Sequence, residues 1–123
     1  MSAPADVVAF ARRHYPADLD REAFSIILVG ARNQLLRLLV VSVGTLTASL
    51  VHPREVFAPA IRYRAASLIM VHNHPSSDPE PSDDDLALTK RLVKAGELLG
   101  IEVLDHVILA GTKSLSLKTR GVV

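Results

Sequence analysis

The sequence predicts a mixed α/β (α+β) fold, in which a single β-sheet is flanked by helices. Short runs rich in Val, Ile and Leu, at residues 24–29, 35–43 and 67–72, are typical of strands. Segments with apolar residues at helical spacing, at 53–65 and 82–99, alternate with these runs. With 123 residues, of which 49% are hydrophobic and 22% charged, the chain has the size and composition of one globular domain.

The N-terminal residues are predicted to form a segment of their own. Residues 5–15 suit a short helix that Pro16 ends, so residues 1–20 are interpreted as a helix and linker. The domain itself is expected to span residues 21–123. Within it the elements are predicted to follow in the order β-β-α-β-α-β-β.

Turn signals divide the first half of this domain. Residues 30–34 join the first two strands into a hairpin, and residues 44–47 predict a break with a short strand or a bend. Pro53 suits the first turn of the following helix, whereas Pro59 lies in its interior. We therefore expect that helix to bend at Pro59 or to start later than Pro53.

The second half holds the longest predicted helix and the last strands. Gly100 suits the end of that helix. Residues 101–110 predict one strand or two, because the polar pair Asp105-His106 interrupts the apolar run. Residues 114–118 predict a final strand after a glycine-containing turn.

Composition narrows the classes of function. The 14 basic and 13 acidic residues give a net charge of +1, and the basic residues are scattered, which does not mark a nucleic-acid-binding protein. The absence of cysteine excludes disulfides, thiol nucleophiles and cysteine-type zinc sites. No apolar run suits a signal peptide or a membrane span. We therefore expect a cytoplasmic protein without a membrane partner, as a monomer or small homodimer.

Two histidines at the end of a predicted strand suggest a metal site. Successive side chains on a strand point to opposite faces, so His72 and His74 project the same way and Asn73 is turned aside. Pro75 then ends the strand, because proline has no N–H to donate to a ladder. Two imidazoles on one face can hold one metal ion.

The third ligand is expected from the following helix. Ser82 suits the N-cap position and Asp85 lies on the first turn, from which its carboxylate can swing back toward the strand end. Two histidines and one carboxylate leave an open zinc position for water, which is the catalytic arrangement. We therefore expect His72, His74 and Asp85 to bind one Zn²⁺ per chain. Ser82 and Asp85 can equally form a helix-capping pair, and the two interpretations are compatible.

The remaining acids and histidines receive simpler interpretations. Asp84 is the alternative ligand if the loop register differs by one residue. Four acids, Asp84 included, are interpreted as solvated loop residues, namely Asp78, Glu80, Asp83 and Asp84. His52 and His106 are interpreted as structural, with a contact between His106 and the site as an alternative.

These residues resemble a known signature. His72-Asn73-His74-Pro75 followed by Ser82-Asp83-Asp84-Asp85 is similar to the motif of JAMM (MPN+, JAB) metalloproteases, in which an upstream Glu precedes His-x-His-Pro, a loop and Ser-x-x-Asp. The resemblance is closer still to the bacterial RadC-like proteins. The words that carry it are Gly44-Thr45-Leu46, Val51-His52-Pro53-Arg54-Glu55-Val56-Phe57, His72-Asn73-His74-Pro75-Ser76, Pro81-Ser82, Leu88-Thr89-Lys90-Arg91, Leu99-Gly100-Ile101 and Leu104-Asp105-His106-Val107.

The resemblance implies a fold and an activity. The fold would be a JAB/MPN-like domain of the cytidine-deaminase-like kind. The activity would be a zinc-dependent metalloprotease or isopeptidase, because zinc lowers the pKa of a bound water toward ~7. The family places its general base just ahead of the first core strand, at Glu22 here, with Glu55 as the competing candidate. Ser82 would donate to the developing oxyanion or would only cap its helix.

Two departures from the family pattern bear on function. Ser77 stands where the family usually has Gly, which is expected to stiffen the loop without removing a ligand. Full-length RadC-like proteins also carry a helix-hairpin-helix region that binds DNA nonspecifically, and residues 1–20 are too short to replace it. The alternatives to a hydrolase of peptide or protein substrates are a metal-free binding module, a zinc nuclease, and a DNA-repair or mobile-element-associated factor that acts by binding.

Overall fold

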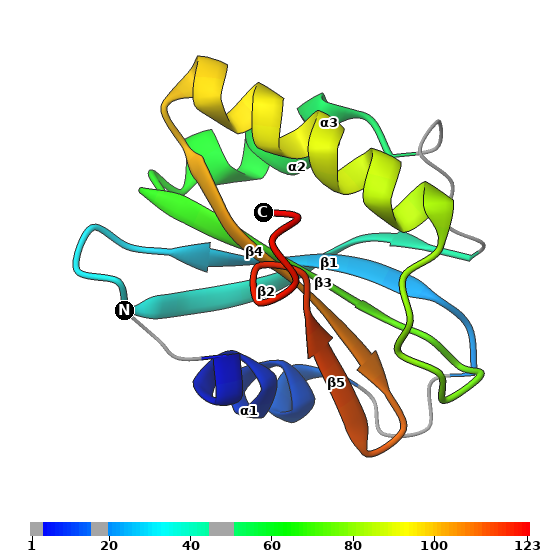
Figure 1. Ribbon diagram of the computed structural model, residues 1–123. Helices are drawn as coiled ribbons and strands as arrows, with labels where there is room; N and C mark the ends of the chain where they lie inside the picture. The colour runs from blue at the N-terminus through cyan, green and yellow to red at the C-terminus, as the bar shows by residue number, and fades with distance from the viewer. Residues whose placement is uncertain (1–3, 16–19, 45–50) are drawn as a thin grey trace.

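The computed structural model describes residues 4–15, 20–44 and 51–123 (Figure 1). An N-terminal helix precedes the order β-β-α-β-α-β-β, which confirms the predicted fold class. The elements are α1 (Pro4–His14), β1 (Ala23–Val29), β2 (Leu35–Val43), α2 (Pro53–Arg62), β3 (Ser67–Asn73), α3 (Asp83–Leu99), β4 (Glu102–Ala110) and β5 (Lys113–Ser116). Along these residues, no helix combines the length and the apolar character that a membrane span requires.

The five strands form one sheet in the order β2-β1-β3-β4-β5. Strands β3 and β4 are parallel, and the other neighbouring pairs are antiparallel. Parallel neighbours need a long crossover connection, which α3 supplies between β3 and β4. Helices α2 and α3 cover one face of the sheet and α1 covers the other (Figure 1).

The inner strand β1 is buried along its whole length because both faces of the sheet are covered. Alternate side chains point to opposite faces, so Phe24, Ile26 and Leu28 pack in the cluster with α2 and α3. Ile27 and Val29 pack on the other face, in the cluster that includes residues of α1. Burial of these side chains supplies the main driving force for assembling the layers.

Helix α1 is held on the sheet by apolar and polar contacts. Val7 and Ala11 are buried in its contact with the sheet. The Tyr15 hydroxyl lies 2.8 Å from Ser25 Oγ in β1 and 3.1 Å from the Val71 carbonyl in β3. Burial raises the pKa of Tyr15 to about 12, so its phenol is neutral at physiological pH. The described part of the N-terminal segment is therefore packed against the domain.

Two predicted elements differ from the observed ones. Helix α2 begins at Pro53 and includes Pro59, so the expected later start is wrong. The His52 side chain accepts a hydrogen bond from the Arg54 N–H (3.2 Å), which caps this helix and gives His52 the structural role expected of it. Pro59 has no N–H to donate to the carbonyl of Glu55, four residues earlier. Glu55 is exposed in the first turn of α2, so water can donate to that carbonyl instead.

Strand β4 is continuous, which decides between the two alternatives for residues 101–110. Its polar pair is accommodated by a bulge, since Leu68 pairs with Val103 while Ile69 pairs with Asp105. The final strand is shorter than expected and ends at Ser116. Of the predicted break at 44–47, only Gly44 lies within the described residues.

We expect Tyr15→Phe to lower the free energy of unfolding by about 1–2 kcal/mol at neutral pH, because buried partners of the hydroxyl lose their hydrogen bonds. The pKa of Tyr15 is raised in the folded state, so this contribution is present below about pH 10 and is lost as the pH rises toward 12. Urea unfolding of both proteins at about pH 8 and about pH 11 measures the difference. If the difference in free energy of unfolding between the two proteins does not shrink at the higher pH, the stabilising role given to the neutral Tyr15 hydroxyl is wrong.

Candidate metal centre

The two histidines of the motif lie where β3 ends. His72 is the penultimate residue of β3, where it pairs with Phe24 in β1 and Ile108 in β4, and its side chain is fully buried. His74 follows the strand and is half-buried. The ring centroids are 4.6 Å apart, with the planes inclined at 69°. The strand period therefore brings both imidazoles to one side, at the boundary between core and solvent.

Asp85 of helix α3 reaches both rings. Its Oδ1 lies 3.1 Å from His72 Nε2, and its Oδ2 lies 3.1 Å from His74 Nε2. The Asp85 side chain is buried, whereas the alternative ligand Asp84 is exposed. The structure thus brings together the three side chains expected to bind zinc, and their role as ligands stays a prediction.

A capping box fixes the Asp85 carboxylate. The Asp85 N–H donates to Ser82 Oγ (3.1 Å), and the Ser82 N–H donates to Asp85 Oδ2 (2.8 Å). Burial by itself would raise the pKa of the Asp85 carboxyl. The facing His72, the Ser82 N–H and His74 outweigh burial and hold that pKa well below its usual range. Asp85 is therefore a rigidly mounted anion.

Glu22 lies beside the histidines, immediately before β1. Its carboxylate and one nitrogen from each of His72 and His74 all lie within 4.8 Å of one another. Glu55, the competing candidate for the general base, is exposed on α2 beside Arg54. Two carboxylates, from Glu22 and Asp85, therefore flank the same pair of imidazoles.

Asn73, the residue between the two histidines, positions the segment that carries Glu22. Its Oδ1 accepts a hydrogen bond from the Ala23 N–H (2.7 Å), and its Nδ2 donates to the Arg21 carbonyl (3.0 Å). The Gly44 N–H donates to the Glu22 carbonyl (2.7 Å). These bonds hold the backbone on both sides of Glu22, so the side chain is presented from a fixed position.

The loop after β3 fixes the proton on His74. His74 Nδ1 lies 2.7 Å from the Asp78 carbonyl, which can only accept a hydrogen bond, so Nδ1 carries a proton and Nε2 is the nitrogen that meets Asp85, in a hydrogen bond of 3.1 Å with Oδ2. The loop turns tightly, with the Ser77 N–H donating to the His74 carbonyl (3.1 Å). Ser77 has φ +66°, a left-handed conformation that explains why glycine suits this position in the resembling family.

His72 Nε2 provides the test of whether these residues fit a metal ion. It is the one buried side-chain nitrogen or oxygen among the described residues that has no hydrogen-bond partner. It faces the ionised Asp85 oxygen at 3.1 Å without the alignment of a hydrogen bond. Such orphaned atoms are rare in folded proteins, and a cation would satisfy both electron-rich atoms. Ligand atoms of a tetrahedral zinc ion lie about 3.3 Å apart, close to this separation. The residues therefore fit a divalent metal.

Two buried residues extend the cluster into the core. His106 Nε2 lies 2.9 Å from His72 Nδ1, and Thr89 Oγ1 lies 2.6 Å from His106 Nδ1. Burial lowers the pKa of His106 to about 3, so the ring is neutral. His106 thus contacts the site, as the alternative interpretation expects. No role in the site is predicted for Thr89 from the sequence, although it stands in one of the family-like words and on the same helix face as Asp85, one turn later.

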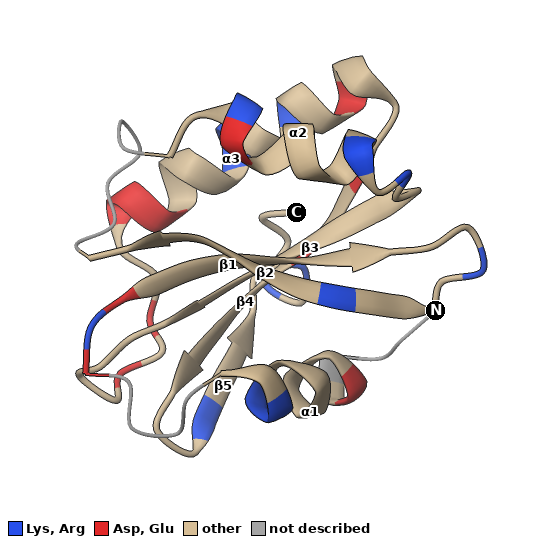
Figure 2. Ribbon diagram, turned by 180° about the vertical axis from the view of Figure 1, so that it is seen from behind, with Lys and Arg blue, Asp and Glu red and all other residues tan. Residues whose placement is uncertain are grey.

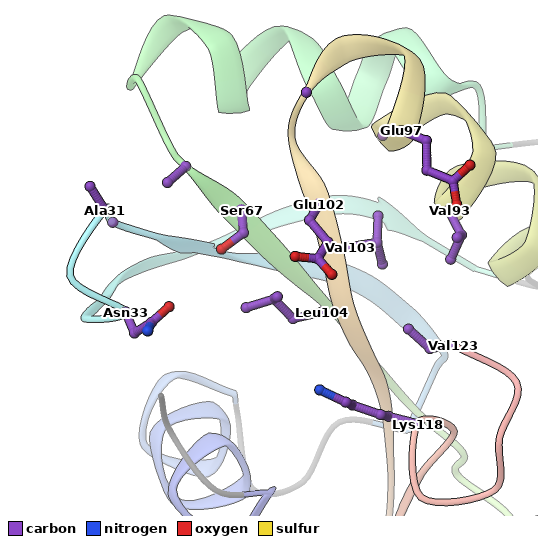
Figure 3. Close-up of a pocket in the computed structure, with 14 residues that line it drawn as sticks. Ala31, Asn33, Ser67, Val93, Glu97, Glu102, Val103, Leu104, Lys118 and Val123 are labelled. Atoms are coloured by element: carbon purple, nitrogen blue, oxygen red, sulfur yellow. The ribbon is translucent and has the colours of Figure 1, made fainter.

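Charge and surface shape distinguish this end of the sheet from the other. Acidic residues gather near the start of β1 and the N-terminal end of α3, whereas basic residues are dispersed (Figure 2). A hollow of about 630 Å³ lies at the opposite end, near the β1–β2 turn and the end of α3 (Figure 3). Glu97, Glu102 and Lys118 line it, and the metal-site histidines do not.

Comparisons with known proteins agree with this architecture. The family model described as RadC-like JAB domain matches residues 1–122. A UPF0758 protein of Desulforamulus reducens is 56% identical over 106 residues, which cover 86% of this chain and 47% of that relative. A UPF0758 protein of Rubrobacter xylanophilus is 50% identical over 122 residues, which cover 99% of this chain and 53% of that relative. The chain therefore spans about half the length of these curated relatives.

The fold and the cluster define a mixed α+β domain with a histidine–carboxylate site where a central strand meets a helix N-terminus. The chain belongs to the RadC-like JAB domain family. The resemblance carried by the motif words is confirmed by this match.

We expect Ser77→Gly to raise the free energy of unfolding by up to about 1 kcal/mol. A residue other than glycine costs about 1–2 kcal/mol in the left-handed conformation of Ser77, and glycine relieves this strain. The greater entropy of glycine in the unfolded chain offsets about 0.5–1 kcal/mol of the relief. Ser77→Ala is the matched control, because it keeps the Cβ atom and should not gain stability. Thermal melts of the three proteins decide the point, and a glycine variant less stable than the alanine variant would disprove strain at this turn.

Proposed function

We propose that this chain is the metal-binding domain of a zinc-dependent hydrolase of JAMM type. In this proposal His72, His74 and Asp85 hold one Zn²⁺ per chain, and Glu22 is the general base. The observation that carries the proposal is the buried, unpartnered His72 Nε2 facing an ionised carboxylate. The family membership of the chain supports the same chemistry without specifying the reaction.

Asp85 is a better third ligand than Glu22. Its two oxygens lie 3.1 Å from the two Nε2 atoms, and it is buried and fixed by the capping box. Glu22 is less buried than Asp85, and its carboxylate lies within 4.8 Å of one nitrogen of each histidine. A carboxylate at the solvent-facing edge of the cluster suits proton transfer, because it stays close to the reacting groups without being consumed as a ligand.

The chemistry divides among the chain's own residues. Zinc, when bound, supplies Lewis acidity that lowers the pKa of a coordinated water toward ~7. Glu22 accepts a proton from the attacking nucleophile and returns it to the leaving group. In this proposal the exposed Ser82 hydroxyl, at the N-cap of α3, donates to a developing oxyanion. Its present hydrogen bond with the Asp85 N–H uses it as an acceptor, which leaves its proton free for that role.

We propose peptide or isopeptide bonds in protein substrates as the target. The exposed residues 76–78 follow the histidines directly, so a polypeptide crossing this loop would pass the site. The acidic surroundings do not favour a DNA backbone, since phosphates would meet carboxylates there (Figure 2). Because the chain spans about half of its relatives, the substrate and partners of a whole protein belong to the same proposal.

Asp85→Asn and Glu22→Gln discriminate between the two carboxylates. We expect the wild-type protein, purified without chelator, to contain one zinc per chain and to lose thermal stability when the metal is removed. Zinc at about a hundred times its Kd stabilises by about 2.7 kcal/mol. Asp85→Asn should lose most of this stabilisation, whereas Glu22→Gln should retain zinc and lose hydrolysis of a panel of fluorogenic peptide and isopeptide substrates.

Asp84→Asn is the control, because it removes an exposed charge from the same helix turn and should bind zinc like the wild type. Elemental analysis gives the zinc content, and melting curves with and without added zinc give the stabilisation. Loss of zinc from Glu22→Gln but not from Asp85→Asn would reverse the assignment of ligand and base. A zinc-free wild type that gains no stability from the metal would refute the proposal.

Ser82→Ala separates oxyanion stabilisation from helix capping. Loss of an oxyanion donor should lower kcat by roughly a hundred- to a thousand-fold, whereas loss of a cap costs only ~1 kcal/mol of stability. We expect both effects, because Ser82 caps α3 beside Asp85 and is the oxyanion donor in this proposal. Ser82→Asp is the contrast variant, since it preserves a capping oxygen but has no proton to donate at neutral pH. If wild type and Ser82→Ala have equal kcat, Ser82 caps the helix and does not stabilise the oxyanion.

A further inference from the structure

The polar groups behind His72 form a continuous chain that ends on a backbone carbonyl of α3. Thr89 Oγ1 lies 2.7 Å from the Asp85 carbonyl and 2.6 Å from His106 Nδ1, and His106 Nε2 lies 2.9 Å from His72 Nδ1. His72, Thr89 and His106 have no solvent-exposed surface. Each hydrogen bond in this chain must therefore be satisfied within the protein.

The chain has a single sensible arrangement of protons. The Asp85 carbonyl can only accept, so the Thr89 hydroxyl donates its one proton there. Thr89 Oγ1 must then accept from His106, which places a proton on His106 Nδ1. A second proton on His106 Nε2 would make a fully buried cation between two neutral partners, at a high desolvation cost. The proton shared by the two rings therefore belongs to His72 Nδ1.

We infer that Thr89 and His106 are positioning residues that fix the tautomer of His72, so that Nε2 is the nitrogen able to offer a lone pair to a metal. The Asp85 carbonyl is a fixed acceptor, and it sets the direction of each hydrogen bond from Thr89 through His106 to His72. The side chain of the same residue faces His72 Nε2. One residue of α3 thus supplies the carboxylate at the front of His72 and the carbonyl that sets the proton behind it.

The ring of His106 is itself held firmly. Its backbone N–H donates to Asp105 Oδ1 (2.7 Å), and its carbonyl accepts from the Leu117 N–H (2.9 Å). Phe24 packs edge-on against the ring, with centroids 6.2 Å apart. These contacts fix the backbone and one side of the ring, which explains how a polar chain keeps its geometry inside an apolar core.

This inference rests on the proposed function for its purpose, and its first test needs no metal. In the metal-free protein, long-range ¹H–¹⁵N NMR spectra of the imidazoles report which ring nitrogens carry protons. We expect a proton on His72 Nδ1 and on His106 Nδ1, and none on His106 Nε2. A His72 whose Nδ1 carries no proton, or a His106 protonated at Nε2, would overturn the assignment whether or not the protein binds zinc.

Thr89→Val and Thr89→Ser provide the second test. Valine keeps the shape but removes the acceptor for His106 Nδ1, which frees His106 to move its proton to Nε2 and drive the His72 proton onto the metal-binding nitrogen. We expect zinc affinity, measured by competition with a chromophoric chelator, to fall by about 10- to 100-fold in Thr89→Val. Thr89→Ser keeps the hydroxyl and should bind zinc like the wild type.

The readouts separate positioning from a merely structural role. A structural role would lower the melting temperature of either variant in proportion to lost packing and leave the His72 proton on Nδ1. A valine variant with wild-type zinc affinity, or a serine variant as impaired as the valine one, would contradict the inference. A wild type that binds no zinc would defeat the proposed function, while the metal-free NMR result would still decide the proton arrangement.

Discussion

The arrangement depends on one carboxylate held between two rings. Asp85 is a helix-cap partner of Ser82 and, at the same time, the anion that faces His72 and His74. The capping box orients the carboxylate without a metal, and a hydrogen bond between Asp85 Oδ2 and His74 Nε2 (3.1 Å) joins the first turn of α3 to the residue that follows β3. A pre-oriented ligand loses less freedom on binding, which favours a tight and specific metal site.

The surrounding fold explains how so polar a site is tolerated. Strands β1, β3 and β4 are covered on both faces, and the histidines lie at the end of β3, where apolar packing gives way to solvent. Asn73 holds the chain at Glu22, His106 satisfies the inner nitrogen of His72, and Thr89 satisfies the far nitrogen of His106. The one buried side-chain atom left without a partner among the described residues is therefore the atom that a metal would use.

Much of this could be predicted from the sequence, for identifiable reasons. Strand and helix periods and the His-x-His and Ser-x-x-Asp spacings are local, so the element order and the meeting of His72, His74 and Asp85 follow from them. Pro59 misled the prediction of α2 because a local penalty was outweighed by a well-capped start at His52. The contact between His106 and Thr89 depends on how α3 packs over β4, and no local pattern encodes that distance.

The most direct test of the central claim is a crystal structure of the zinc-loaded protein, with anomalous diffraction recorded at the zinc edge. We expect one zinc peak per chain, within about 2.0–2.2 Å of His72 Nε2, His74 Nε2 and an Asp85 oxygen, with Glu22 outside the coordination sphere. A zinc ion bound through Glu22 while Asp85 stays in its capping position beyond bonding distance, or bound through His72 Nδ1, would contradict it.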